Sequence, residues 1–583
     1  MKQNKKEPIR LRIHIIGCIL CLFLIVIGIR AFHIQVFCNS GLSKKAADEY
    51  KKSLVFHGKR GTIFDAKHRE LAVSLEVKSI AAYPRLIEDV HLAAKALSTA
   101  LKLNRRTLVR TFKSKKSFVW IKRKVSPQEV LKVKALKLSG IDFIPEYKRF
   151  YPNKTLASQV IGFSGTDGHG LEGIEFYYDN LLKGTSDSLT VLKDASGNKF
   201  ALEETDEKEK TPDFNGNNLI LTIDGTIQYI TEQALKEAVS NCSGKSGIAI
   251  VMAPKTGAIL AIAHFPFFNP NSFRDFDLEL WRNRAITDPF EPGSTIKIFT
   301  AAGAIEHGIC TSNSIFYCEN GKYAVGENIV NDTHKYGWLS VQHIIKYSSN
   351  IGAVKISEKM GNEILYNNLL KFGFGSKTGI DCPGETTGYL SHFRKWSKID
   401  AAAISFGQGI SVSPIQLVAA VSAIANKGQL VKPYIVQAVT DQNGSVIKNH
   451  TPEKTGKIVS EKTSTVITKM LESVISSGGT GTKANLEGYN VCGKTGTAQK
   501  IDTNGKYSGK NYISSFIGFV PSVNPEAVIL VVIDEPKKNY YGGIVAAPAF
   551  KKIALKTLDY MNIAPTKKVK GNLVVYKHGE AKG

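Results

Sequence analysis

The sequence predicts a multidomain protein with an N-terminal transmembrane helix, an α+β domain and a C-terminal domain in which helices flank an antiparallel sheet. Three observations indicate this class. One apolar run of membrane length lies near the N-terminus, strand and helix patterns mix between residues 58 and 154, and strand patterns occur at both ends of residues 218–562 with helices between them. The 583 residues suffice for about three or four domains.

The apolar run predicts a membrane anchor at residues 13–36, preceded by a cytoplasmic tail at residues 1–12. Residues 15–29 carry no charge, and Arg30 is the one arginine inside the longer span. No small-residue cleavage site follows, so we expect an uncleaved single-pass anchor rather than a signal peptide. The basic residues before the run place the N-terminus inside and everything after about residue 40 outside. These residues are Lys2, Lys5, Lys6, Arg10 and Arg12.

The net charge of +26 is large for a folded protein. A nucleic-acid partner would explain it, but the predicted location outside the membrane argues against nucleic acid. Residues 101–154 hold sixteen Lys and Arg against three Asp and Glu, which gives +13, half of the net charge. This stretch is either a solvated basic face or a docking surface for an acidic partner or an anionic envelope polymer.

Eight cysteines divide between the anchor and the rest of the chain. Cys18 and Cys21 lie in the anchor, where packing rather than metal binding is expected. The other six could form disulfides in an oxidising compartment, although sequence does not give their connectivity. No metal site or cofactor is expected. The six are Cys38, Cys242, Cys310, Cys318, Cys382 and Cys492, of which Cys310 and Cys318 are the closest pair.

Residues 37–215 form the predicted α+β domain, which ends in a charged, glycine-bearing hinge or loop at residues 194–213. Ser126 and Pro127 open one helix, because serine caps a helix and proline suits its first turn. The other elements follow from apolar spacing. Residues 58–65 lead into 70–74 as strand, turn and strand, residues 117–124 and 141–147 are strands, and residues 84–101 are an amphipathic helix.

Residues 216–562 form the predicted C-terminal domain, and residues 563–583 form a basic tail. Its strand patterns stand at both ends, and this arrangement indicates one antiparallel sheet with helices around it. The predicted strands are residues 219–223, 247–252, 258–264, 514–520 and 527–534, and the helices at either end are residues 226–239 and 547–560.

A candidate nucleophile lies in the stretch Phe-Glu-Pro-Gly-Ser-Thr-Ile-Lys at residues 290–297. The proline and glycine suit a sharp entry into a helix at residues 294–307, which puts Ser294 in the first turn. Residues three apart share a helix face, so the Lys297 amine can reach the Ser294 hydroxyl. A buried lysine with a lowered pKa can take the proton of that hydroxyl. Serine and lysine are common, and the same spacing recurs at residues 196–199 and 445–448.

Fifty-four residues later, Ser348-Ser349-Asn350 lies between two predicted helices, one capped by Ser340 and ending at Tyr347, the other beginning at Ile351. The Ser348 hydroxyl can relay a proton, and the Asn350 amide can hold a substrate amide. Ser-x-Asn occurs twice more in the chain, so this match also needs support from other motifs.

Lys-Thr-Gly occurs four times. The copy at Lys255 predicts a hairpin turn, the copy at Lys377 lies in a glycine-rich turn, and the copy at Lys454 predicts a loop after a proline. Only the fourth copy continues with a further threonine and leads into an apolar strand, where a backbone N–H can stabilise an oxyanion. The sequence therefore favours Lys494, Thr495, Gly496 and Thr497 as the substrate-binding strand.

The order Ser294-x-x-Lys297, Ser348-x-Asn350 and Lys494-Thr495-Gly496 resembles the transpeptidase domain of penicillin-binding proteins. Arg60-Gly61 and residues 170–175 resemble the pedestal, or dimerisation-type domain, of the monofunctional class B group. The interval between the anchor and Arg60 has no room for the glycosyltransferase domain of class A. Residues 59–74 resemble the septal, division-type branch more than the elongation branch, although Asp65 to Glu70 depart from the usual Asp-Arg-x-Gly.

The resemblance implies that the protein is a bacterial inner-membrane enzyme that cross-links peptidoglycan stem peptides through a serine acyl-enzyme and is inhibited by β-lactams. Ser294, Lys297, Ser348, Asn350 and Lys494 would be catalytic, and Lys494 to Thr497 would bind the substrate carboxylate. The implied partners are stem peptides, the lipid-linked precursor, β-lactams, a glycosyltransferase and division proteins.

Three other functions stay open at this point. Water instead of an amine as acceptor would make the protein a D,D-carboxypeptidase, and an idle site would make it a scaffold of the division machinery. An elongation-type transpeptidase is the third. A β-lactamase is disfavoured, because no Glu-x-x-Leu-Asn follows Asn350 and such an enzyme needs no long pedestal or anchor.

Overall fold

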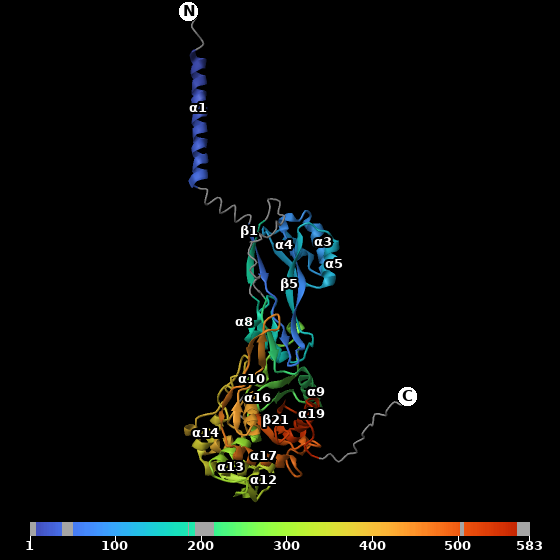
Figure 1. Cartoon of the computed structure of the whole chain (residues 1–583), viewed down its shortest axis with the longest axis vertical. Coiled ribbons are helices and arrows are strands. Elements are labelled where there is room, and N and C mark those ends of the chain that lie inside the picture. Colours follow the sequence, from blue (N-terminus) through green and yellow to red (C-terminus); the bar gives the residue numbers. More distant parts are fainter. Residues whose placement is uncertain (1–6, 38–50, 185, 193–214, 502–506, 568–583) are drawn as a thin grey trace, which may run out of the picture. The chain divides into compact units, whose positions relative to one another are not determined.

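The computed structural model describes residues 7–37, 51–184, 186–192, 215–501 and 507–567 (Figure 1). The chain divides into two compact units. The first comprises residues 1–58 and 185–214, and the second comprises residues 59–184 and 215–583.

The first unit contains the predicted anchor. Helix α1 (Glu7–Phe32) continues into a π-helical turn, η1 (His33–Phe37). Residues Leu11–Val36 are long and apolar enough to cross a membrane, in agreement with the predicted span at residues 13–36. The sequence therefore placed this helix correctly.

The first unit also holds two strands that the sequence did not predict. Strand β1 (Lys51–His57) pairs antiparallel with β8 (Ser186–Leu192). The predicted hinge or loop at residues 194–213 lies outside the described residues.

The second unit begins with a seven-stranded sheet in the order β18-β17-β9-β2-β3-β4, in which β5 also pairs with β3. The predicted strand at residues 219–223 is β9 of this sheet, where it pairs with β2 and β17 and not with the sheet of the C-terminal domain. Leu219 and Leu221 are fully buried there, and this burial of apolar surface stabilises the strand in the pedestal sheet. The strands are β2 (Ile63–Phe64), β3 (Glu70–Ala82), β4 (Val119–Val125), β5 (Ile141–Phe150), β9 (Asn218–Leu221), β17 (Val436–Thr440) and β18 (Val446–Asn449).

Three helices pack on the C-terminal half of β3 and form the head of the pedestal around a small apolar core. The helix predicted at residues 84–101 is split, because the Asp89 carboxylate accepts hydrogen bonds from two backbone N–H groups and starts a new helix there. Ser126 and Glu129 form the capping box of the predicted helix at Pro127. The head contains η2 (Pro84–Leu86), α3 (Val90–Leu101), α4 (Arg105–Phe112) and α5 (Pro127–Ala135).

Near the C-terminal domain, the buried carboxylate of Glu175 pairs with two guanidinium groups. Arg60 Nε and Arg149 Nε each lie 2.6 Å from it, and the Tyr151 hydroxyl donates to it at 3.2 Å. Desolvation opposes the charge on Glu175, but the two arginines outweigh it, and the pKa of Glu175 is lowered. This cluster explains the Arg60-Gly61 motif, since Gly61 also lies against Asn217 where no side chain would fit.

The C-terminal domain is built on a five-stranded antiparallel sheet in the order β11-β10-β22-β21-β20. Successive residues of β22 are buried on opposite faces, so helices cover both sides. α9 and α19 pack on one face, and α11, α16 and α17 pack on the other (Figure 1). The strands are β10 (Ser246–Met252), β11 (Ile259–Phe265), β20 (Cys492–Ile501), β21 (Tyr507–Val520) and β22 (Ala527–Asp534), and the helices are α9 (Gly225–Asn241), α11 (Lys297–Glu306), α16 (Pro414–Ala425), α17 (Glu461–Ile475) and α19 (Ala547–Tyr560).

Shorter elements complete the second unit. They are α6 (Ser158–Ile161), β6 (Phe163–Ser164), β7 (Gly170–Glu172), α7 (Gly173–Tyr177), α8 (Asp179–Leu182), η3 (Pro270–Asp275), η4 (Leu278–Leu280), α10 (Arg284–Thr287), η5 (Gly293–Ile296), β12 (Ile315–Tyr317), η6 (Glu319–Gly321), β13 (Lys322–Val325), β14 (Asn328–Asn331), β15 (Trp338–Ser340), α12 (Val341–Tyr347), α13 (Asn350–Met360), α14 (Asn362–Lys371), η7 (Phe393–Lys395), α15 (Lys398–Ser405), β16 (Gln429–Val431), β19 (Lys454–Lys457), η8 (Thr482–Ala484) and α18 (Gly542–Val545).

Two expectations change with the structure. Lys454 starts the short strand β19 rather than lying in a loop, because β16 offers it an unpaired edge. The cysteines of the described residues, Cys310 and Cys318 included, are free thiols, so none of the disulfides considered above forms among them. The predicted domain boundaries, 37–215 and 216–562, remain predictions.

Candidate active site

Ser294 lies on η5, the tight turn that leads into α11. The sequence predicted a single helix from this residue, whereas the structure has a 3-10 turn followed by the α-helix from Lys297. Gly293 has a φ of +53°, and the backbone of Thr497 lies against it, so glycine is favoured at the entry to the turn. Ser294 as a whole is half-buried at this turn.

The Lys297 side chain is 1% exposed and points to the turn between α12 and α13. Its Nζ donates at 2.6 Å to the backbone oxygen of Ser348 and at 2.6 Å to Asn350 Oδ1, with a longer contact of 3.4 Å to Ser348 Oγ. Across the described part of the chain, no hydrogen bond joins Lys297 to Ser294, although the sequence spacing predicted that the amine could reach this hydroxyl.

Ser348 and Asn350 reach the lysine because the chain turns sharply between the two helices. Ser348 ends α12 in the left-handed region with a φ of +62°, an uncommon conformation for a residue with a side chain. Ser349, the middle residue of the motif, caps α13 by accepting from the backbone N–H of Gly352. The Asn350 amide donates to the backbone oxygen of Asn331, which turns its own oxygen toward Lys297.

Lys494 reaches the same serine from the edge strand β20. Its Nζ donates to Ser348 Oγ at 2.8 Å and to the Thr495 backbone oxygen at 3.1 Å, and its side chain is fully buried. The other three Lys-Thr-Gly lysines are far from this arrangement. Lys255 forms an exposed ion pair with Glu526 in the turn between β10 and β11, and Lys377 and Lys454 are exposed.

Gly496 allows β20 to lie directly against η5. A Cβ atom at this position would lie 2.2 Å from Ser515 Oγ and 3.0 Å from a methyl carbon of Thr295. Thr495 Oγ1 donates to Thr480 Oγ1 at 3.0 Å, and Thr497 Oγ1 accepts from the Gly542 backbone N–H at 3.2 Å. The strand and the serine turn are therefore held at backbone contact distance.

Burial lowers the pKa of both lysines. Desolvation lowers the pKa of Lys297 to about 7, partly offset by the charge of Asp332. Desolvation lowers the pKa of Lys494 well below its ordinary value, and the neighbouring Lys297 charge lowers it further. Two ammonium groups that share the Ser348 hydroxyl repel each other, so the site favours a state with one proton fewer than two free lysines would carry.

Sequence reasoning missed Asp332. Its carboxylate accepts from Ser349 Oγ at 2.6 Å and from the backbone N–H groups of Asn350 and Ile351 at 2.5 and 3.1 Å. It thus fixes the start of α13 and, through it, the Asn350 amide. No pattern could have found Asp332, because its role depends on the fold that brings the end of β14 to the serine motif.

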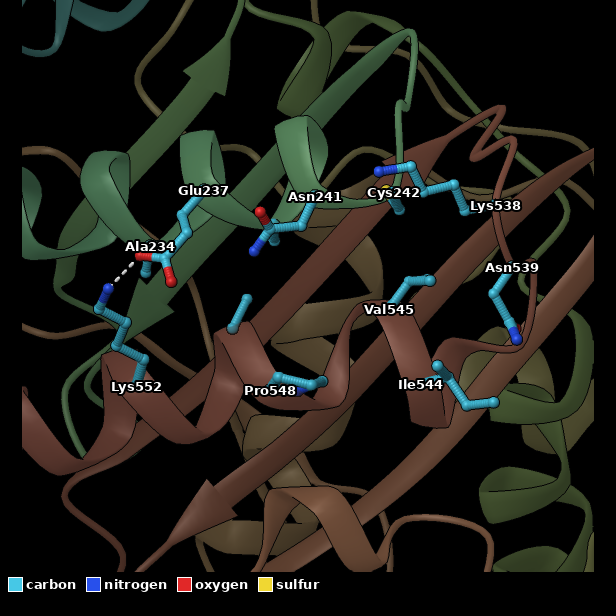
Figure 2. A pocket seen from close by; sticks show the side chains of 12 residues that line it. Ala234, Glu237, Asn241, Cys242, Lys538, Asn539, Ile544, Val545, Pro548 and Lys552 are labelled. Atoms are coloured by element: carbon cyan, nitrogen blue, oxygen red, sulfur yellow. Dashed lines mark hydrogen bonds and ion pairs between the residues drawn. The ribbon is translucent and has the colours of Figure 1, made fainter.

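The four-residue helix α18 separates the site from a groove of about 290 Å³ between α9 and α19 (Figure 2). The Gly542 backbone N–H, at the start of α18, donates a hydrogen bond to Thr497 Oγ1, while Ile544 and Val545 line the groove. An ion pair between Glu237 and Lys552 crosses it, as Figure 2 shows. None of the eight predicted site residues lines this groove, so it is a separate feature.

Comparison with protein families gives two matches in the order that the structure shows. Residues 56–221 match the penicillin-binding protein dimerisation domain, and residues 247–555 match the penicillin-binding protein transpeptidase domain, more than half of the chain. The chain belongs to the penicillin-binding protein family. The two domains together mark a class B member, that is, a penicillin-binding serine D,D-transpeptidase.

Relatives of this penicillin-binding protein align over almost the whole chain. "Probable peptidoglycan D,D-transpeptidase PenA" of Neisseria meningitidis is 36% identical over 92% of this chain and 90% of its own length. The peptidoglycan D,D-transpeptidase FtsI of Escherichia coli is 32% identical over 97% of this chain and 95% of its own length.

Solved structures agree with this fold. Penicillin-binding protein 3 of Mycobacterium tuberculosis in complex with aztreonam has a TM-score of 0.69 and 27% identity, over 88% of this chain and 99% of that one. A peptidoglycan synthetase of Bifidobacterium adolescentis has a TM-score of 0.72 and 26% identity, over 89% and 98%.

We predict that alanine at Lys494 lowers the rate of acylation by a fluorescent penicillin by about 10²-fold or more, since this residue alone of the four contacts Ser348. Alanine at Lys255, Lys377 or Lys454 serves as the matched control and should change the rate by less than about twofold. If alanine at Lys377 or Lys454 lowers the acylation rate of a folded protein as much as alanine at Lys494, the assignment of Lys494 to the active site is wrong.

We also predict that acylation of the wild-type enzyme rises with pH through a midpoint near 7. A charged Lys297 has no lone pair, so the rate should fall about tenfold per pH unit below that midpoint and level off above it. The acylation rate constant, measured from about pH 5.5 to 8.5, checks this, with Lys255→Ala expected to keep the same midpoint. A flat profile would rule out Lys297 as the base.

Proposed function

We propose that Ser294 is the nucleophile of this transpeptidase and that Lys297 is its general base. The observation that carries this proposal is the set of contacts around Lys297 Nζ. A neutral amine has two N–H groups and one lone pair. Its two short bonds, to the Ser348 backbone oxygen and Asn350 Oδ1, use both N–H groups, which leaves the lone pair for the Ser294 proton.

In the proposed reaction, the Ser294 oxygen attacks the penultimate D-Ala carbonyl of a stem peptide while its proton passes to Lys297. The backbone N–H groups of Ser294 and Thr497 stabilise the oxyanion that forms. A new ester bond forms, and the C–N bond to the terminal D-Ala breaks. Close packing of β20 on η5 supports this arrangement, because Gly293 lies against the Thr497 backbone.

The leaving amine needs a proton, and the pair of Ser348 and Lys494 can supply it. Lys494 donates to Ser348 Oγ at 2.8 Å, so this hydroxyl can pass its own proton on and take one from the lysine. Lys494, Thr495 and Thr497 would bind the terminal carboxylate of the substrate, and Asn350 a peptide amide. Gly496 keeps the strand close enough for these contacts.

An amine from a second stem peptide then attacks the ester, which forms the cross-link and frees Ser294. The carboxypeptidase alternative uses water in this step, and the scaffold alternative does not form the ester at all. The intact set of lysine and serine contacts supports catalysis over a scaffold.

We further propose that helix α1 anchors the enzyme in the bacterial inner membrane, with the N-terminus inside and the catalytic domain outside. The apolar span Leu11–Val36 and the basic residues before it support this topology. It suits a substrate carried on a lipid, and a glycosyltransferase and division proteins would be partners. The resemblance of residues 59–74 supports a septal role, with elongation as the alternative.

We predict that a fluorescent penicillin labels the wild-type chain once, at Ser294, and that the adduct persists for many minutes. Long life follows because the sequence has no Glu-x-x-Leu-Asn after Asn350, the motif whose glutamate activates water in β-lactamases. Ser294→Ala should give no label while remaining folded by circular dichroism. Labelling that survives this substitution would refute the nucleophile, rapid turnover would indicate a hydrolase, and no labelling of the folded wild type would favour the scaffold.

We predict that a functional fluorescent fusion of the chain concentrates at the division site in dividing cells. The catalytically inactive Ser294→Ala fusion should localise in the same way, which separates localisation from activity. A fusion spread evenly along the lateral wall would favour the elongation role.

A further inference from the structure

The head of the pedestal carries a run of unusual charge. Between Asp89 and Glu129 the chain has eleven Lys and Arg and no acidic residue. Seven of these cations lie on α4 and beside it, all of them exposed, and the structure gives none of them an ion pair within the described residues. We call them the α4 basic surface. They are Lys102, Arg105, Arg106, Arg110, Lys113, Lys115 and Lys116.

Other cations of the head do have partners. Lys122 pairs with Glu129 at 2.6 Å, and Arg123 pairs with Glu146 and Asp167. Two cations of the head's sheet thus have acidic partners, whereas none of the seven cations on α4 and beside it has one among the described residues. Seven cations within residues 102–116, with no acidic residue among them, are what distinguish the α4 basic surface from an ordinary solvated face.

The arrangement of α4 costs stability in the isolated protein. Leu108 and Phe112 are buried against the head core, so the other face of the helix is turned to solvent. Arg106 and Arg110 stand four residues apart on that face, a spacing at which like charges destabilise a helix. A polyanion would remove this repulsion on binding.

Two large apolar side chains of the same head are also exposed. Leu86 on η2, which packs against α4, is 62% exposed, and Trp120 on β4 is 40% exposed and stacks edge-on with Phe118. A soluble polyanion would not bury these apolar side chains. The interface of a membrane buries tryptophan and leucine side chains and binds basic residues beside them. The combination favours a lipid surface over a soluble anionic polymer.

We propose that the α4 basic surface binds the anionic phospholipid headgroups of the membrane that holds α1. The proposal rests on the membrane topology given under Proposed function. Because α1 would tether the chain to the same bilayer, the head would meet the lipid at high effective concentration, and contacts of low intrinsic affinity would suffice.

The test uses the full chain inserted into lipid nanodiscs, either of phosphatidylcholine alone or with about 30% phosphatidylglycerol, and follows amide hydrogen exchange in α4. Exchange in α4 should slow by about fivefold or more in the anionic discs, and about 0.5 M salt should remove the effect. The triple variant R105E/R106E/R110E should show no such slowing. The matched control K398E/K462E/K469E, which changes three exposed lysines of the catalytic domain, should behave as the wild type.

Penicillin labelling of each variant checks that the catalytic domain is folded, and exchange in α3 and α5 of phosphatidylcholine discs, which should match the wild type, checks that the head is folded. If α1 is protected from hydrogen exchange in the discs but anionic lipid does not change exchange in α4, this proposal alone is overturned. If α1 is not protected from exchange, the membrane topology is overturned and this proposal with it. Soluble polyphosphate could also slow exchange in α4 in phosphatidylcholine discs. If it does and phosphatidylglycerol adds no further effect, the surface binds an anionic polymer and the proposal is overturned.

Discussion

The site depends on one residue, Ser348, that two buried lysines share. The Ser348 hydroxyl accepts a hydrogen bond from Lys494, and the Ser348 backbone oxygen accepts one from Lys297. The left-handed backbone of Ser348 turns its hydroxyl and its backbone oxygen toward these two lysines. Desolvation lowers the pKa of both lysines, and the charge of Lys297 lowers that of Lys494 further. The same contacts that hold the lysines in place therefore make one of them a base near neutral pH.

This arrangement requires backbone segments from distant parts of the chain to meet without side chains between them. Gly293 and Gly496 allow the serine turn to lie on strand β20, and Gly542 lets α18 close over the same strand, where a Cβ would lie 2.4 Å from the Gly496 oxygen. The five-stranded sheet supplies the rigid support, since β20 is its edge and both faces of the strands behind it are buried. Precision at the site thus comes from glycines on a rigid sheet.

Sequence patterns predicted the elements whose signal is local. The anchor, the capped helix at Pro127 and the two final strands of the sheet were all found, because apolar period and capping residues act within a few positions. The place of β9 was missed, since its pairing with β2 and β17 depends on residues more than 150 positions away. Lys494 was separated from its three rivals by the strand that follows it. Asp332 could not be found, because it acts only where β14 ends beside α13.

Two buried clusters of charge show how the chain distinguishes structural from chemical use of ions. Around Glu175, two guanidinium groups lie 2.6 Å from the carboxylate, so desolvation is outweighed and the pKa of Glu175 is lowered. Around Lys297, the acceptors are a backbone oxygen and an amide oxygen, and Asp332, the carboxylate whose charge acts on the lysine, is bound to the start of α13. Neutral acceptors hold an amine in place without fixing its charge. An amine whose charge is not fixed can exchange a proton during a reaction, whereas a buried ion paired with opposite charges cannot.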